Sequence, residues 1–171
     1  QQHNSTSPSD AHAGVLAAVS NAAGRYHVTM AEDNLPQQTS DRTTLRQLAW
    51  AVAMAGAYGL TIREGGQVGP IELLPDALFA DCGNVVKFFT QTPYRALAPA
   101  DALATAGSQY VLANANRTAF VLYSSSAGGS LGISQSAPGT YDLVWMDIVS
   151  GVLSAASASV PGGAVRFAPP G

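Results

Sequence analysis

The sequence predicts an α/β segment, residues 1–95, followed by an all-β segment, residues 105–171. In the first segment, stretches of helical periodicity alternate with short apolar runs. In the second, short β-rich runs are separated by Gly, Pro, Asn or Ser about every 8 to 12 residues. That spacing is typical of an antiparallel sandwich or barrel.

Two apolar runs that each end in an acid organise the α/β segment. Residues 26–34 end in Glu32, Asp33 and Asn34, and residues 58–64 end at Glu64. A helical segment over residues 42–57 joins the two runs. The order strand, helix, strand predicts parallel strands whose carboxyl ends meet at one edge of a barrel or open sheet. In both kinds of fold, functional side chains gather at that edge.

Further helices are predicted around these strands. Residues 11–23 carry apolar side chains at helical spacing, with Ser9 and Asp10 able to cap the start and Gly24 at the expected stop. Residues 73–90 form another helical segment. The joining helix has an apolar face, made of Leu45, Leu48, Ala49, Val52 and Ala53, which we expect to cover the strands.

The all-β segment is predicted to follow a boundary near residues 92–107, where Pro93 and Pro99 interrupt the helical pattern. Its predicted strands are residues 110–114, 118–123, 130–134, 140–147, 151–153 and 164–167.

Composition narrows the possible functions. Charged residues make up 11% of the chain, against about 25% in typical domains. The formal charge of −3 favours neither nucleic-acid binding nor attachment to an anionic membrane. No apolar run is long enough to predict a membrane span. A single cysteine, Cys82, excludes an internal disulfide and a Cys-based zinc site, and we expect it to be a small buried hydrophobe in a helix. No metal or other cofactor is predicted.

With these pieces in this order, the chain resembles the C-terminal part of a secreted (β/α)8 glycoside hydrolase. The matching pieces are residues 28–32, 46–61, 86–89, 118–123 and 139–147. More narrowly, it is similar to the apiosidase-type family, in which a β-sandwich named for collagen binding follows the catalytic barrel. The resemblance covers most of the chain, and it implies an extracellular enzyme that acts on a polysaccharide or glycoside.

The resemblance also implies a role for Glu32. In that family the acid at the tip of the seventh barrel strand is the nucleophile, and Glu32 matches its position. Residues 1–64 would then be the last βα units of a barrel whose first five or so strands are absent from this chain. The acid/base, at the tip of the fourth strand, has no counterpart here. The alternative is that Glu32 is a structural acid that caps a loop or helix.

Retaining glycosidases need two carboxyl groups about 5–5.5 Å apart, one to attack the anomeric carbon and one to protonate the leaving oxygen. Glu32 supplies one of them. Glu64, at the next strand's tip, is a candidate for substrate binding. As a second catalyst it is disfavoured, because acids on adjacent parallel strands would lie on the same side of the sugar.

Four more polar residues are candidates for substrate binding. Asp33 and Asn34 follow Glu32 and are expected to shape the turn or to hydrogen-bond Glu32. His3 and Asn4 would lie in the loop after the sixth strand of the barrel, where substrate-binding groups are common. The alternative for His3 and Asn4 is a solvated terminus.

The expected partners follow from the same interpretation. The chain begins at Gln1 without a methionine, and we expect it to be a piece of a longer protein. An N-terminal barrel half would complete the enzyme, whereas an open barrel fragment would self-associate through its strand edges. The competing hypothesis is a non-catalytic module that binds carbohydrate or matrix, or is structural, and that self-associates. The sequons at Asn4 and Asn116 are compatible with an extracellular location.

Overall fold

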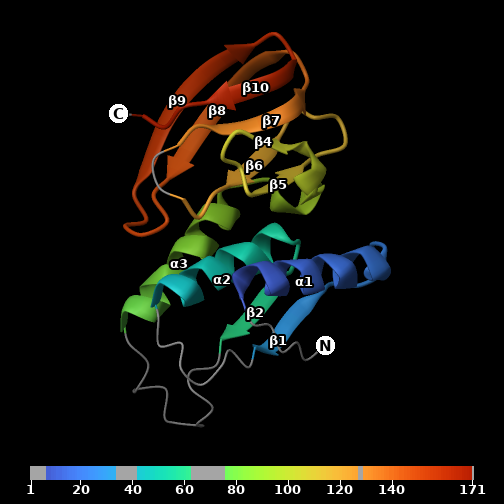
Figure 1. Cartoon of the computed structure of the whole chain (residues 1–171), viewed down its shortest axis with the longest axis vertical. Coiled ribbons are helices and arrows are strands. Elements are labelled where there is room, and N and C mark those ends of the chain that lie inside the picture. The colour runs from blue at the N-terminus through green and yellow to red at the C-terminus, as the bar shows by residue number, and fades with distance from the viewer. Residues whose placement is uncertain (1–6, 34–41, 63–75, 127–128, 171) are drawn as a thin grey trace. The chain divides into compact units, whose positions relative to one another are not determined.

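The computed structural model describes residues 7–33, 42–62, 76–126 and 129–170 (Figure 1). These residues confirm a chain of mixed helices and strands, and within them the strands form no closed barrel. The chain divides into two compact units, Gln1–Val86 and Lys87–Gly171. The division falls within a helix, and each unit is described by itself below.

The first unit contains a parallel strand pair with helices between and around its strands. Its elements are α1 (Pro8–Ala22), β1 (Thr29–Asp33), α2 (Arg42–Met54), β2 (Gly59–Ile62) and the start of α3 (Asp76–Thr90). β1 and β2 run parallel, with Met30 opposite Leu60 and Asp33 opposite Ile62, and an irregularity lies between these two positions. Parallel neighbours require a crossover, which α2 provides. The predicted order strand, helix, strand is confirmed.

The start of α1 lies a little earlier than the sequence pattern suggested. Ser7 is the N-cap, and its hydroxyl accepts a hydrogen bond of 3.2 Å from the backbone N–H of Asp10. Pro8 occupies the first turn of the helix. N–H groups there have no acceptor within the helix, so the missing N–H of proline removes no hydrogen bond, and its fixed φ suits a helix. The expectation that Ser9 and Asp10 would cap the helix was therefore wrong.

The core of the first unit lies between α1, α2 and β1. Leu48 of α2 is fully buried, and Val15 of α1 and Met30 of β1 belong to the same cluster. His12 of α1 lies in this interface too, with Nδ1 2.7 Å from the carbonyl oxygen of Ala51. Met30 and Leu60 thus face the helices. The apolar face of α2 packs against the strands, as predicted.

The second unit consists of short antiparallel strands. Its elements after α3 are the 3-10 helix η2 (Tyr94–Ala96), β3 (Ala98–Pro99), the 3-10 helix η3 (Asp101–Leu103), β4 (Ala104–Thr105), β5 (Tyr110–Ala113), β6 (Phe120–Tyr123), β7 (Leu131–Ser136), β8 (Gly139–Met146), β9 (Leu153–Val160) and β10 (Gly163–Phe167). Within the described residues they form three sheets, ordered β10-β7-β4, β3-β5-β6 and β8-β9.

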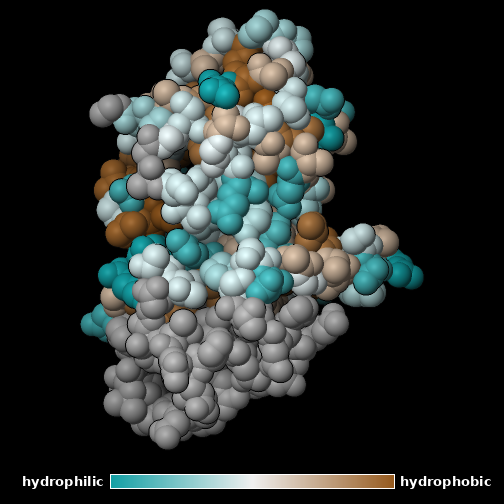
Figure 2. All heavy atoms as spheres, viewed as in Figure 1, coloured by the Kyte–Doolittle hydropathy of each residue, from teal (hydrophilic) through white to brown (hydrophobic). Residues whose placement is uncertain are grey.

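The core of the second unit is built around β5, whose residues are all buried. Val111 and Ile133 are fully buried and share a cluster with Leu103 and Ala113. Beside them, Asp101 accepts a hydrogen bond of 2.9 Å from the backbone N–H of Val111, which ties η3 to β5. Figure 2 shows hydrophobic patches among pale residues of intermediate hydropathy on one face of this unit.

The hairpin β8–β9 differs from the prediction. A strand was expected at residues 151–153, but Gly151 lies in a turn with φ +70° and the strand begins at Leu153. The turn is held by Asp147, whose Oδ1 accepts hydrogen bonds from the N–H groups of Val149 (2.7 Å) and Ser150 (3.0 Å). β9 then pairs with β8 without a bulge along its whole length.

Candidate functional site

The carboxyl ends of β1 and β2 lie at the same edge of the parallel pair (Figure 1). Glu32 and Asp33 are the last two residues of β1, and Ile62, the last residue of β2, is the partner of Asp33. The backbone therefore places Glu32 one position before the end of its strand. This edge is where ligands bind in parallel α/β folds.

Of the predicted site residues, the structure describes the backbone of Glu32 and Asp33, which are consecutive at the end of β1. His3, Asn4, Asn34 and Glu64 lie outside the described residues.

α2 begins at this same edge. Because the chain leaves the end of β1 and returns to the start of β2 through α2, the helix runs against the strands (Figure 1). The N-terminus of a helix carries a partial positive charge, which stabilises anions within about one turn. The edge with Glu32 thus has a positive helix end beside it.

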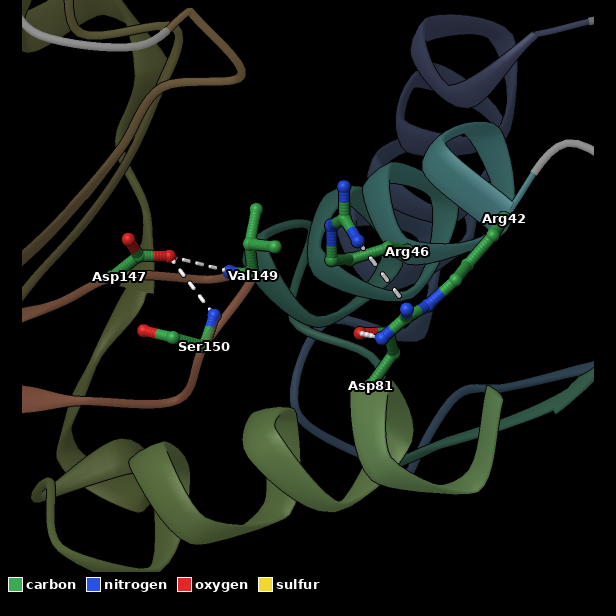
Figure 3. Close-up of polar contacts among 6 residues, drawn as sticks. All are labelled: Arg42, Arg46, Asp81, Asp147, Val149 and Ser150. Carbon is green, nitrogen blue, oxygen red and sulfur yellow. Dashed lines mark hydrogen bonds and ion pairs between the residues drawn. The ribbon is translucent and has the colours of Figure 1, made fainter. Parts of the chain in front are cut away.

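An ion-pair cluster links the start of α2 to α3 (Figure 3). Asp81 of α3 is 1% exposed. Arg42 donates to both of its oxygens, from Nε to Oδ2 at 2.7 Å and from Nη2 to Oδ1 at 3.0 Å. Arg46, one turn along α2, has Nη1 3.6 Å from Oδ2. The hydrogen bond to Asp81 raises the pKa of Arg42, and the charge of the same carboxylate adds to this against the opposing effect of desolvation.

Sequence reasoning missed this cluster. Arg42 and Arg46 are spaced by one helical turn, which places them on one face of α2. Nothing local indicates Asp81 as their partner, because it lies 39 positions beyond Arg42. The sequence offered one indirect signal: Asp81 falls on the apolar face of the predicted helix. A buried carboxylate there would need a cationic partner, because buried carboxylates are almost always paired.

Cys82 lies next to Asp81 and is half-buried against the core of the first unit. Desolvation raises the pKa of its thiol, and the charge of Asp81 raises it further. Thiolate is the nucleophilic form of cysteine. Cys82 is therefore a poor nucleophile at neutral pH, as expected of a residue that serves for packing.

The described residues contain no group of three or more His, Cys, Asp or Glu side chains that could hold a metal ion. Nor does this part of the chain include a helix long and apolar enough to cross a membrane.

No protein-family model matches the chain, and no curated protein matches it.

Proposed function

We propose that the chain is the C-terminal part of an extracellular retaining glycoside hydrolase that acts on a polysaccharide or glycoside. In this proposal the first unit supplies the last βα units of a (β/α)8 barrel, with Glu32 as the nucleophile. The antiparallel sheets of the second unit form a β-sandwich accessory domain.

The observation that carries the proposal is the parallel register of β1 with β2. Asp33 is opposite Ile62, so the two strands end together, and Glu32 lies at the edge where barrel enzymes hold their catalytic groups. The crossover through α2 supports the same interpretation, because barrel strands are joined by such helices.

The proposed chemistry uses Glu32 in two steps. Its carboxylate attacks the anomeric carbon while a second carboxylic acid protonates the leaving oxygen, which gives a covalent glycosyl-enzyme. Water then hydrolyses this ester, with the second group acting as base. We assign that second group to a barrel strand outside this chain. Asp33, with His3, Asn4, Asn34 and Glu64, would bind the sugar hydroxyls.

The experiment is to measure glycoside hydrolysis by the chain alone and after completion with a polypeptide that carries the missing strands. The chain alone should be inactive, and the completed enzyme should release sugar. Glu32→Gln should reduce turnover by about 10³-fold or more, because it removes the nucleophile but keeps the shape. Val86→Ala, on an exposed side chain, is the matched control. Full activity of Glu32→Gln would refute the assignment.

A specific observation favours the second candidate, a non-catalytic binding or structural module that self-associates. Val144, Val149 and Val152 of the β8–β9 hairpin are 55%, 54% and 60% exposed. Exposed apolar side chains on a sheet whose edges are unpaired among the described strands favour association. Replacing the three valines with threonine should then lower the molecular mass measured by light scattering. An unchanged mass would leave this candidate without support.

A further inference from the structure

Among the described residues, Arg46 is a buried cation with one unsatisfied donor, Nε. Its side chain is 10% exposed. Its Nε has no hydrogen-bond partner within the part of the chain that the structure describes. The Nη1 atom is 3.6 Å from Oδ2 of Asp81, which is too far for a hydrogen bond.

Asp81 does not complete the coordination of Arg46, because its nearest oxygen stays 3.6 Å from Nη1 and the carboxylate is directed at Arg42. The two oxygens of Asp81 accept from Nε and Nη2 of Arg42 at 2.7 and 3.0 Å (Figure 3). The cluster of two guanidinium groups and one carboxylate therefore keeps one excess positive charge. Buried charges and buried donors without partners are costly, and native structures rarely retain them.

We propose that Arg46 binds a small oxyanion at the Nε edge of its guanidinium, a carboxylate or a tetrahedral sulfate or phosphate. The side of a guanidinium that carries Nε and one Nη offers two parallel donors, which match two oxygens of such an anion. One negative charge neutralises the excess charge of the cluster.

The position on α2 favours the same class of ligand. Arg42 is the first residue of this helix, and Arg46 lies about one turn inside it. The helix dipole adds positive potential near that end, and helix N-termini are common anion sites. The proposal does not depend on the role of Glu32, so it stands or falls separately from the glycosidase assignment.

The test is a titration of the full chain with sodium sulfate and with sodium acetate, against sodium chloride at matched ionic strength. Bound anion stabilises the folded state, so the midpoint of thermal unfolding should rise saturably. At an anion concentration ten times Kd the rise should be about 3–5 °C. A response to sulfate alone would indicate a tetrahedral site, and a response to acetate alone would indicate a carboxylate site.

Variants identify the binding residue. Arg46→Met and Arg46→Gln should lose the saturable rise, whereas Arg95→Gln, on an exposed arginine of η2, should keep it. In the unsubstituted chain, the Nε–H resonance of Arg46 should shift along the same saturation curve, which gives a readout independent of any variant. An equal rise in Arg46→Met, or no saturable response to either oxyanion, would overturn the proposal.

Discussion

Arg42 on α2 holds Asp81 on α3 by two parallel hydrogen bonds, of 2.7 Å from Nε to Oδ2 and 3.0 Å from Nη2 to Oδ1. The carboxylate is almost wholly buried, whereas the Arg42 side chain is 47% exposed. The pair joins two helices that are 39 positions apart in the sequence. It fixes the start of α2, which lies at the same edge of the first unit as Glu32.

Replacing Asp81 tests this link. Asp81→Asn keeps the shape of the side chain but removes its charge, so Arg42 and Arg46 repel each other without a counter-ion. We expect a loss of about 2–3 kcal/mol in the free energy of unfolding. Denaturant unfolding measures it, with Asp142→Asn on the exposed face of β8 as the matched control. A loss no larger than that of the control would show that the pair does not support the fold.

Leu48 tests the core of the first unit. It is fully buried in the cluster between α1, α2 and β1. Leu48→Ala removes an isopropyl group and leaves a cavity, so we expect a loss of about 2–5 kcal/mol in the free energy of unfolding. Val86→Ala, at a side chain that is 63% exposed, should change stability by less than about 0.5 kcal/mol. Calorimetry of both variants checks the contrast. Similar losses in the two variants would contradict the burial of Leu48 in this core.

The raised pKa of Tyr110 leads us to expect that the second unit loses stability at alkaline pH. Burial raises the pKa of its hydroxyl; the hydrogen bond with Gln109 lowers it, and the charge of Asp101 raises it again. The folded state therefore holds the phenol proton more tightly than the unfolded state. Stability should fall as the pH rises above about 10, where unfolded tyrosine ionises. The fall should be smaller in Tyr110→Phe. An identical pH profile in that variant would assign the effect to other groups.

The hydrogen bonds of Asp147 lead us to expect that this residue stabilises the β8–β9 turn. Its Oδ1 accepts from Val149 and Ser150, and Asp147→Ala leaves both N–H groups without this acceptor (Figure 3). We expect amide exchange in β9 to become faster, equivalent to about 1 kcal/mol of lost local stability. Asp147→Asn retains an oxygen acceptor and should have a smaller effect. Unchanged exchange in Asp147→Ala would mean that backbone pairing alone holds the hairpin.

The sequence predicted the elements whose apolar pattern has a clear period. The face of α2 and its position between two parallel strands follow from Leu45, Leu48 and Val52. The strand ends were less accurate, because residues 26–28 look apolar but pairing begins at Thr29. The predicted boundary at residues 92–107 also contains the short strands β3 and β4, which are too brief to leave a pattern.

β9 and the arginine cluster were missed for two different reasons. β9 consists largely of Ser and Ala, which have little strand propensity, so its structure comes from pairing with β8. The contact of Arg42 with Asp81 depends on how α2 and α3 pack, which no local spacing reports. Glu32, in contrast, could be placed at a strand end from sequence, because an acid directly after an apolar run marks that end.

The most direct test of the central claim is to trap the covalent intermediate. The completed enzyme would be incubated with 2-fluoro glycosides, which slow hydrolysis of the glycosyl-enzyme, and its peptides analysed by mass spectrometry. If Glu32 is the nucleophile, a sugar is attached to Glu32, and Glu32→Gln is not labelled. A sugar attached to another carboxylate, or sugar release that persists without Glu32, would contradict it.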